Sequence, residues 1–401
     1  MNLVVMKFGG TSVGNVEKIQ NVANIVEKES KFNKIIVVLS AMSGATNNLQ
    51  SYLDKIDSKP SVESDLVLTS GEQVTVGILS IILKNKGIRA LPLLGWQLPI
   101  ITDDIHEKAK ILKIDTNNIK NYFKSNDVIV LAGFQGVSTD GFITSLGRGG
   151  SDTTAVAIAS AISADRCDIY TDVEGVYSAD PNIEPKAKKI DKVSFEEMLE
   201  MSSTGAKVLH TRSVELAMKN NLRLQVLSSI TKKEGTFVLD ENDIIEKEIV
   251  SGVSHSKNES KITISGILDK PGISAKIFGL MSENNINVDM IVQNISQDGV
   301  LANITYTVAT KDLNFAMLIL EKNLKILNYK SIDANEKVSK VSVIGMGMMS
   351  QSGVAEKMFK TLANNSINIL AISTSEIKIS VLIDEKYTNL AVKSLHEVYK
   401  L

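Results

Sequence analysis

The chain has 401 residues, a formal net charge of −2 and an apolar fraction of 43%. This length allows roughly two to three domains with real cores, and the charged residues are interspersed rather than blocked. The composition therefore predicts a soluble globular protein that binds small molecules. It lacks the basic surface expected of a protein that binds nucleic acid or an anionic membrane.

Signals for targeting, membranes and metals are weak. No basic-then-apolar leader opens the chain, and apolar stretches such as residues 76–83 are too short to span a bilayer. We therefore expect a cytoplasmic protein. Cys167 is the single cysteine, and the four histidines are scattered without metal-ligand spacing. The sequence predicts neither a disulfide nor a structural zinc site.

The first chemical signal is the segment Lys7-Phe8-Gly9-Gly10-Thr11-Ser12, which follows an apolar strand at residues 3–6 and precedes a helical pattern. Glycines let backbone N–H groups close around phosphate oxygens. A following helix adds its positive N-terminus, and Lys7 adds a full charge. The segment predicts a phosphate-binding loop, with a simple tight turn as the alternative. The G-x-x-x-x-G-K-[ST] pattern of an ordinary P-loop is absent from the chain.

Strand-like runs alternate with helical patterns over the first 240 residues, which predicts an α/β domain with a parallel sheet covered on both faces. The runs are residues 35–39, 128–132, 168–171 and 222–227. Two helix faces are expected to pack on this sheet. They consist of Val16, Ile19, Val22, Ala23 and Val26, and of Ala155, Ile158, Ala159 and Ile162.

Two further loops of this region carry polar groups suited to substrates. Residues 147–154 bring Arg148, Ser151 and Asp152 to the start of the small-residue helix, where helix N–H groups are also free. Residues 171–181 follow a strand and contain an acid and an aromatic suited to adenine and ribose. The alternatives are an N-cap with a surface arginine for the first loop and a surface turn for the second.

The last third of the chain contains a repeat. Residues 241–260 are rich in charged and small polar residues and predict a linker. Beyond them, residues 271–288 align with residues 352–369 at an offset of 81. Each copy reads as strand, glycine turn, amphipathic helix, asparagine turn and strand. We expect two small α+β modules, residues 261–335 and 336–401, that pair with one another or across a dimer.

Taken together and in this order, the motifs resemble those of the aspartokinases of the amino acid kinase superfamily. The matching segments are residues 7–13, 39–47, 70–72, 147–154, 171–181 and 205–210. The repeat fits the tandem ACT domains that aspartokinases carry after the kinase domain. The resemblance implies a three-layer αβα kinase domain over residues 1–240, followed by two ferredoxin-like ACT modules.

The resemblance also implies transfer of the γ-phosphoryl group of ATP to the side-chain carboxylate of L-aspartate. The product, 4-phospho-L-aspartate, enters lysine, threonine and methionine synthesis, including the diaminopimelate route. By this resemblance Lys7 and Asp152 are catalytic, and aspartate is bound by Ser40, Thr46, Glu72, Arg148 and Ser151. The nucleotide contacts are Lys7, Gly9, Gly10, Thr171, Asp172, Tyr177 and Lys207. Mg²⁺ is expected to arrive with ATP, without a dedicated metal site in the protein.

The ACT resemblance implies that an end-product amino acid, lysine or threonine or both, regulates the kinase. The expected effector contacts are Asp269, Gly272, Ile273, Ser274, Asn287, Val288, Asp289, Gln293 and Asn368. A homodimer or homotetramer assembled through the ACT domains is expected as well. No methionine between Met218 and Met281 could start a separate small subunit.

Two residues depart from the family pattern. Asn182 stands where relatives usually have arginine, which leaves one nucleotide contact open, and Ser352 replaces the usual proline of the second ACT turn. Two other functions remain as alternatives. One is a related kinase for glutamate, acetylglutamate or a nucleotide, and the other is an amino acid sensor with an inactive kinase domain. The segment Ser70-Gly71-Glu72 and the repeat argue against a related kinase. The retention of Lys7, Arg148 and Asp152 argues against an inactive kinase domain.

Overall fold

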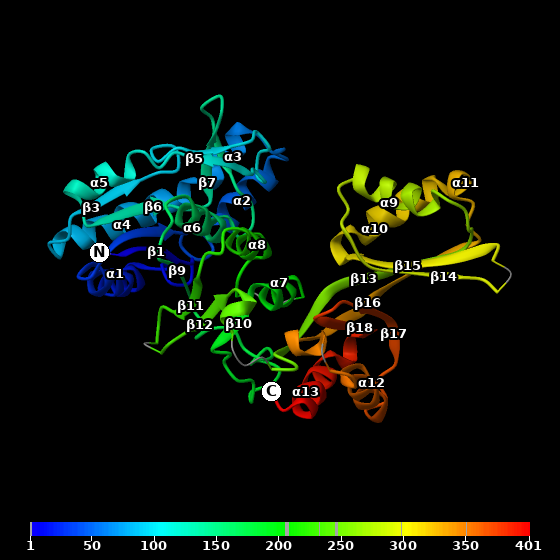
Figure 1. Cartoon of the computed structure of the whole chain (residues 1–401). Coiled ribbons are helices and arrows are strands. Elements are labelled where there is room, and N and C mark those ends of the chain that lie inside the picture. Colours follow the sequence, from blue (N-terminus) through cyan, green and yellow to red (C-terminus); the bar gives the residue numbers. More distant parts are fainter. Residues whose placement is uncertain (1, 205–207, 232, 245–247, 298, 350) are drawn as a thin grey trace. The chain divides into compact units, whose positions relative to one another are not determined.

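The computed structural model describes residues 2–204, 208–231, 233–244, 248–297, 299–349 and 351–401 (Figure 1). The chain divides into two compact units. The first comprises Met1–Val176, Lys189–Ser202 and Lys207–Ile245, and the second comprises Tyr177–Lys188, Ser203–Ala206 and Glu246–Leu401. A segment from the middle of the chain, Tyr177–Lys188, thus belongs to the C-terminal unit.

The first unit is built on an eight-stranded sheet in the order β10-β12-β11-β9-β1-β2-β6-β3. Its neighbouring strands run parallel, except that β11 and β12 are antiparallel. The strands are β1 (Asn2–Phe8), β2 (Asn33–Leu39), β3 (Ala90–Leu93), β6 (Val128–Ala132), β9 (Arg166–Thr171), β10 (Lys192–Ser194), β11 (Leu224–Ser228) and β12 (Thr236–Leu239). The α/β class with a mainly parallel sheet is therefore confirmed.

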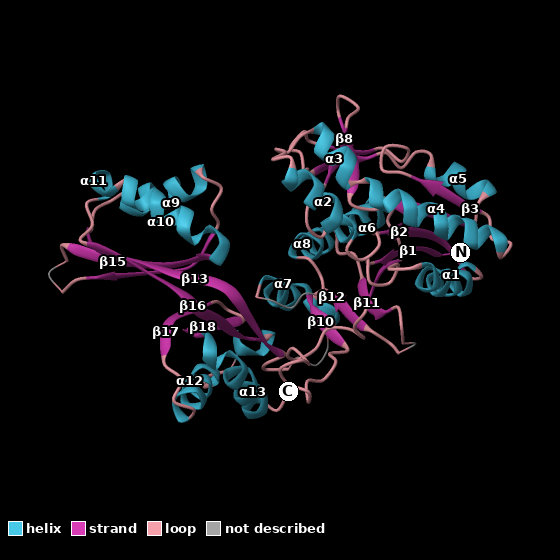
Figure 2. Ribbon diagram, turned by 180° about the vertical axis from the view of Figure 1, so that it is seen from behind, coloured by secondary structure: helices cyan, strands magenta, loops and turns pink. Residues whose placement is uncertain are grey.

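Helices cover both faces of this sheet, as the ribbon views show (Figures 1 and 2). They are α1 (Val16–Ser30), α2 (Ala45–Lys55), α3 (Val62–Leu68), α4 (Ser70–Asn85), α5 (Ile119–Ser125), α6 (Gly150–Ala161), α7 (Phe195–Ser203) and α8 (Thr211–Lys219). A small second sheet has the order β5-β4-β7-β8. Its strands are β4 (Ile100–Thr102), β5 (Ile111–Ile114), β7 (Gln135–Ser138) and β8 (Ile143–Ser145).

The predicted apolar face of α1 is buried, with one exception. Ile19, Val22, Ala23 and Val26 have no exposed surface and pack in the core with β1, β2 and α4. Val16 is 47% exposed, so its predicted burial is wrong. It is the first residue of the helix, directly after the cap residue Asn15.

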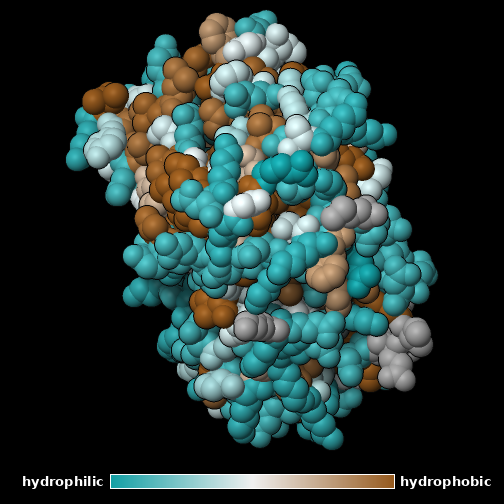
Figure 3. Space-filling view, turned by 90° about the vertical axis from the view of Figure 1, so that its left-hand side faces the viewer, coloured by the Kyte–Doolittle hydropathy of each residue, from teal (hydrophilic) through white to brown (hydrophobic). Residues whose placement is uncertain are grey.

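One helical stretch of the described residues, 62–85, has the length and hydropathy of a membrane span. A buried helix of a soluble protein passes the same test, and Val76, Leu79 and Leu83 of α4 lie in the core. On the face shown in Figure 3, hydrophilic residues predominate and apolar residues gather toward the upper part.

The second unit is built on a six-stranded antiparallel sheet in the order β14-β15-β13-β16-β18-β17. The strands are β13 (Gly252–Leu268), β14 (Val288–Ile295), β15 (Leu301–Ala309), β16 (Ser331–Ile344), β17 (Ile369–Thr374) and β18 (Lys378–Asp384). The helices are α9 (Ile273–Glu283), α10 (Leu313–Lys322), α11 (Leu324–Leu327), α12 (Val354–Asn364) and α13 (Thr388–Tyr399). Short 3₁₀ turns lie at Glu241–Asp243, Thr310–Asp312, Met346–Met349 and Glu385–Tyr387.

The predicted repeat appears as two modules of related structure. Helices α9 and α12 start and end at positions that differ by the 81 residues of the sequence offset. Each module has its own core, one formed by β13, β15, α9 and α10 and the other by β16, β18, α12 and α13. The two α+β modules expected from the repeat are confirmed.

The two modules share long strands. Strand β13 pairs with β16 from Gly252 opposite Ile344 to Ser265 opposite Ser331. The first module therefore lies between two parts of the second, whose first strand is the beginning of β13. This strand starts inside the range 241–260 that composition predicts as a linker. Its first residues are buried, including Val253 and the polar Ser254, whereas Lys257 and Asn258 are exposed.

The segment Tyr177–Lys188 contributes to the core of the second module. Ala179 is 4% exposed and lies in that core, with Ile183 and Ala187 packed against it. The carbonyl of Ser178 accepts a hydrogen bond from the N–H of Val253, and its hydroxyl lies 3.0 Å from Nε2 of His396. Covalently, this segment continues the loop that follows β9.

Candidate functional site

The candidate site lies at the carboxyl ends of the parallel strands of the first unit. Strand β1 sits between β2 and β9, where the order of strands along the chain reverses. Crevices that bind ligands form at such switch points in α/β sheets, because successive loops diverge there. A cavity of about 490 Å³ opens here.

The structure brings all seven predicted catalytic and aspartate-binding residues to this cavity, together with Gly10 of the predicted nucleotide contacts. The seven are Lys7, Ser40, Thr46, Glu72, Arg148, Ser151 and Asp152. They come from the ends of β1 and β2, from the first turns of α2, α4 and α6, and from the loop after β8. Segments that lie more than 140 residues apart in sequence thus line one space.

Lys7 and Asp152 form the charged centre of the cavity. The ammonium Nζ of Lys7 lies 2.5 Å from Oδ1 of Asp152, and both side chains are largely buried, with 11% and 13% of their surface exposed. Lys7 is the penultimate residue of β1, and Asp152 lies in the first turn of α6. A lysine held in this way is a fixed positive charge facing a cavity, which suits an anionic group such as phosphate.

The helix that points its N-terminus at the cavity is α6, not α1. After Gly10 the chain makes a turn, and α1 begins only at Val16, with the side chain of Asn15 accepting from the N–H of Lys18. Helix α1 follows the glycine loop, as the sequence predicts, but none of its residues lines the cavity. Helix α6 starts at Gly150 with no side-chain cap, and its first residues line the cavity. Its N–H groups and dipole favour an anion.

The two glycines of the first loop have different roles. The N–H of Gly9 donates to the carbonyl of Tyr170 at 3.3 Å, which ties the end of β1 to β9. Gly10 lines the cavity, and a Cβ there would lie 3.0 Å from the carbonyl oxygen of Ala41. A side chain at residue 10 would thus press on the loop after β2.

Glu72 is a buried carboxylate in which only one oxygen has a hydrogen-bond partner among the described residues. It is 3% exposed, and its Oε1 accepts the N–H of Ala41 at 3.0 Å. Its Oε2 is buried without a hydrogen-bond partner among the described residues. Burial raises the pKa of Glu72 from 4.5 to about 7, against the Ala41 hydrogen bond, which lowers it. The free oxygen suits a cationic group of a ligand, such as an ammonium.

Arg148 lies on the loop between β8 and α6, and its side chain is exposed at the cavity. Within the described part of the chain no ion pair involves it. Ser151, 8% exposed, lies against the loop after β6, where a Cβ on Gly133 would come within 2.8 Å of its Oγ. Small residues at the ends of neighbouring strands therefore let the first turn of α6 approach the sheet closely.

The predicted nucleotide residues are only partly brought together. Thr171 ends β9 next to the Gly9 turn, and its hydroxyl donates to the carboxylate of Asp172 at 3.0 Å. Tyr177 begins the segment that folds with the second unit. Lys207 lies outside the described residues. Asn182, where relatives have arginine, donates to the carboxylate of Asp180 from both its backbone and its side chain.

Two cavity residues that the sequence analysis missed have unusual backbones. Phe134 and Glu107 have φ of +67° and +62°, which side-chain-bearing residues rarely adopt. Both line the cavity. Phe134 follows the buried strand β6, so the run Ala132-Gly133-Phe134 at a strand end was a signal that could have been used. Glu107 carries no comparable local signal.

Three of the predicted effector residues are linked in the first repeat module. The amide of Gln293 donates to the carboxylate of Asp269 at 3.2 Å and accepts from the hydroxyl of Ser274 at 3.3 Å. Gly272, with φ of +90°, caps α9 beside them. Ile273 is 3% exposed and belongs to the core, so only its backbone can meet a ligand.

The other predicted effector residues are placed differently. Asn287 is exposed and Val288 half-buried where β14 begins. Asp289 pairs with the buried ammonium of Lys340, which also contacts Glu259. Although burial opposes it, the Lys340 contact lowers the pKa of Asp289. Asn368 lies in the second module before β17, and none of the hydrogen bonds between described residues links it to the Asp269 group.

Comparison with known protein families gives two matches. Residues 2–228 match the amino acid kinase family, and residues 262–324 and 341–399 match the ACT domain. The fold and the family matches thus define a kinase of the amino acid kinase family with two ACT modules.

Comparison with individual proteins narrows this class. The chain is 47% identical to the aspartate kinase of Pseudomonas putida, over 100% of this chain and 98% of that protein. Escherichia coli aspartokinase III with aspartate and ADP (R-state) superimposes with a TM-score of 0.83 at 25% identity, covering 99% of each chain. The same enzyme with lysine and aspartate (T-state) gives a TM-score of 0.75 at 25% identity, covering 98% of this chain and 99% of that one. The chain belongs to the aspartate kinases of the amino acid kinase family.

Proposed function

We propose that the cavity binds ATP and L-aspartate and transfers the γ-phosphoryl group to the side-chain carboxylate of aspartate. An oxygen of that carboxylate forms a bond to the γ-phosphorus while the bond from this phosphorus to the β–γ bridging oxygen breaks, which yields ADP and 4-phospho-L-aspartate. The acceptor is already an anion, so no general base is needed. The observation that carries the proposal is that the Lys7–Asp152 pair lines one cavity with Arg148 and with Glu72, whose buried Oε2 has no hydrogen-bond partner among the described residues.

The residue roles follow from charge. A phosphoryl transition state spreads negative charge over its equatorial oxygens, so catalysis is chiefly positioning and electrostatic stabilisation. Lys7 and the N-terminus of α6 supply this positive potential, and Asp152 holds the ammonium of Lys7 in place. Arg148 pairs with a carboxylate of aspartate, and Glu72 accepts its ammonium. Ser40, Thr46 and Ser151 complete the aspartate site, while Gly9, Gly10, Thr171, Asp172, Tyr177 and Lys207 contact the nucleotide.

Mg²⁺ is proposed to enter with ATP. The described residues contain no cluster of three or more His, Cys, Asp or Glu side chains that could hold a metal. A magnesium ion held chiefly by substrate phosphates and waters needs no such cluster. When bound, the ion neutralises phosphate charge.

We further propose that the reaction is the first step of lysine, threonine and methionine synthesis and that an end-product amino acid regulates it. The hydrogen-bonded group of Asp269, Ser274 and Gln293, beside the N-terminus of α9, offers partners for both charges of an amino acid. Regulation requires that the effector bind one state of the enzyme better than the other. A cytoplasmic homodimer or homotetramer assembled through the ACT modules accompanies this proposal.

The test is an aspartate- and ATP-dependent hydroxamate assay with lysine, threonine and methionine added singly and in pairs. We expect hydroxamate formation that requires aspartate and falls with at least one of these amino acids. Turnover with glutamate in place of aspartate would reject the substrate assignment. Turnover unaffected by any of the three, up to millimolar concentration, would reject the regulatory part alone.

A further inference from the structure

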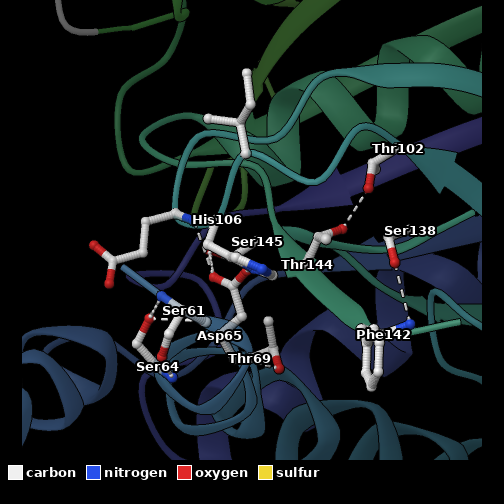
Figure 4. A network of polar contacts seen from close by, with 12 residues as sticks. Ser61, Ser64, Asp65, Thr69, Thr102, His106, Ser138, Phe142, Thr144 and Ser145 are labelled. Carbon is white, nitrogen blue, oxygen red and sulfur yellow. Dashed lines mark hydrogen bonds and ion pairs between the residues drawn. The ribbon is translucent and has the colours of Figure 1, made fainter. Parts of the chain in front are cut away.

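A buried carboxylate outside the cavity ties together two segments of its wall. Asp65 of α3 has no exposed surface. Its Oδ1 accepts the hydroxyl of Ser145 at 2.5 Å and the N–H of Glu107 at 3.1 Å, and its Oδ2 lies 2.7 Å from Nδ1 of His106 (Figure 4). A buried carboxylate is costly unless such partners surround it, so the three contacts hold one another in place.

Two of the three residues that Asp65 contacts line the cavity. Ser145 and Glu107 both line it. The carbonyl of Ser145 accepts the N–H of Ala109 at 3.0 Å, so the segment 106–109 and the end of β8 are joined a second time. A Cβ on Gly147, which has φ of +73°, would lie 2.8 Å from the carbonyl oxygen of Glu107. The two segments therefore pack backbone against backbone directly before Arg148.

A side chain from another helix also holds the segment 106–109 against the residues that follow β8. Arg212 of α8 donates through Nη1 to the carbonyl of Leu146 and through Nη2 to the carbonyl of Ala109, each at 3.0 Å. The residues just before Arg148 are thus held by Asp65 through Ser145 and by Arg212 through Leu146. Arg148 itself has no ion-pair partner among the described residues, so its position depends on this backbone.

We propose that Asp65 is a positioning residue of the aspartate site, which acts by holding the loop of Arg148 through Ser145 and the segment 106–109. This inference rests on the proposed role of Arg148. It predicts that loss of Asp65 weakens the binding of aspartate but not of ATP. The wall that Asp65 fixes carries Arg148, which is proposed to bind aspartate, whereas the proposed nucleotide contacts Thr171 and Gly9 lie at the ends of β9 and β1. A misplacement of about 1 Å in such a group can cost about 100-fold.

The experiment measures KM for aspartate, KM for ATP and kcat in the full-length enzyme. For Asp65→Ala we expect the KM for aspartate to rise by about 10-fold or more while the KM for ATP changes by less than about twofold. Asp65→Asn keeps an oxygen acceptor for Ser145 and Glu107 and should restore most of the affinity. His106→Ala offers a milder variant, because His106 does not line the cavity and can affect aspartate only through its neighbours. We expect a rise of several-fold in the same constant.

A matched control separates positioning from loss of stability. Asp168 is equally buried and pairs with Arg166 near the start of β9, away from the cavity. Asp168→Asn should lower thermal stability without a selective rise in the KM for aspartate. If Arg148→Ala raises that constant but His106→Ala and the folded Asp65 variants leave it within about twofold, the inference is overturned. If Arg148→Ala has no effect, the proposed aspartate site fails instead.

Discussion

Lys7 is the residue at which the proposed chemistry can be tested most directly. Its ammonium is the cation held inside the cavity by Asp152. We expect Lys7→Ala to lower kcat by at least about 100-fold, the scale for loss of one group that stabilises transition-state charge. The measurement is steady-state hydroxamate formation, with circular dichroism to establish folding. Lys34→Ala is the control, because Lys34 lies near the start of β2 and pairs with Asp127. A folded Lys7→Ala enzyme with most of its turnover would refute the role of Lys7.

Glu72 makes the stability of the ligand-free enzyme depend on pH. Its pKa in the folded protein, about 7, lies above its ordinary value of 4.5, so the folded state binds the proton more tightly than the unfolded state. The cost of ionising Glu72 is absent below pH 4.5, grows as the pH rises toward 7 and is fully present above 7. Its size is about 3 kcal/mol, from a shift of roughly 2.5 pH units at about 1.4 kcal/mol per unit.

Glu72→Gln should therefore stabilise the ligand-free enzyme at pH 8 and have little effect at pH 4.5, because the amide keeps an acceptor for the N–H of Ala41. Urea unfolding at the two pH values measures this difference. The same variant should bind aspartate more weakly at pH 8, because the ammonium loses its anionic partner. An equal change in unfolding free energy at both pH values would contradict the assignment.

The sequence predicted residues that carry charge or glycine at strand ends, and it missed those that act through the tertiary structure. Lys7, Glu72 and Asp152 belong to local patterns with a direct chemical meaning. Asp65 and His106 do not, because they lie 41 residues apart and meet only when α3 packs beside β8. Asp65 reads as an ordinary acid in the first turn of a helix, where acids are common.

At the scale of elements, the sequence predicted periodic segments well and shared strands poorly. The 81-residue offset placed α9 and α12 at their observed positions because amphipathic helices and their turns are local. The length of β13 could not be predicted from a local sequence pattern in the same way. Residues 256–259 are polar and resemble a linker, yet they are part of one strand. Ser256 pairs with Lys340 of β16, and Glu259 pairs with Val338 of β16 and Ala309 of β15, with a register shift between the two.

This nested arrangement predicts that the first repeat module can be removed with the loss of few contacts of the second module, chiefly those of Lys340 with Glu259 and Asp289. Ser256 and Lys340 are opposite one another in the antiparallel pair of β13 and β16. Replacing residues 257–339 by an Asn-Gly turn should therefore close a hairpin and leave the core of the second module in place. We expect this enzyme to retain phosphoryl transfer and to lose its response to the effector, measured in the hydroxamate assay. A retained response would place the effector site outside the first module.

At the scale of the whole molecule, the catalytic region and the second module cannot be separated by one cut. A chain ending at residue 240 keeps the segment Tyr177–Lys188 but lacks the core that covers Ala179 and Ile183. Exposing one large aliphatic side chain costs about 1.5–3 kcal/mol. We expect this truncated chain to aggregate or to melt at lower temperature than the chain lacking residues 257–339. Size-exclusion chromatography and thermal unfolding compare the two chains. Equal elution profiles and equal melting temperatures would contradict this prediction.

The hydrogen bond from the N–H of Val253 to Ser178 and the contact of Ser178 with His396 also constrain the order of events on the ribosome. Proteins are synthesised from the N-terminus, and N-terminal domains generally fold first. Here the loop after β9 emerges long before His396, which lies 218 residues after Ser178 in the chain. The second unit can therefore complete its packing around Ser178 only after these 218 residues have been synthesised.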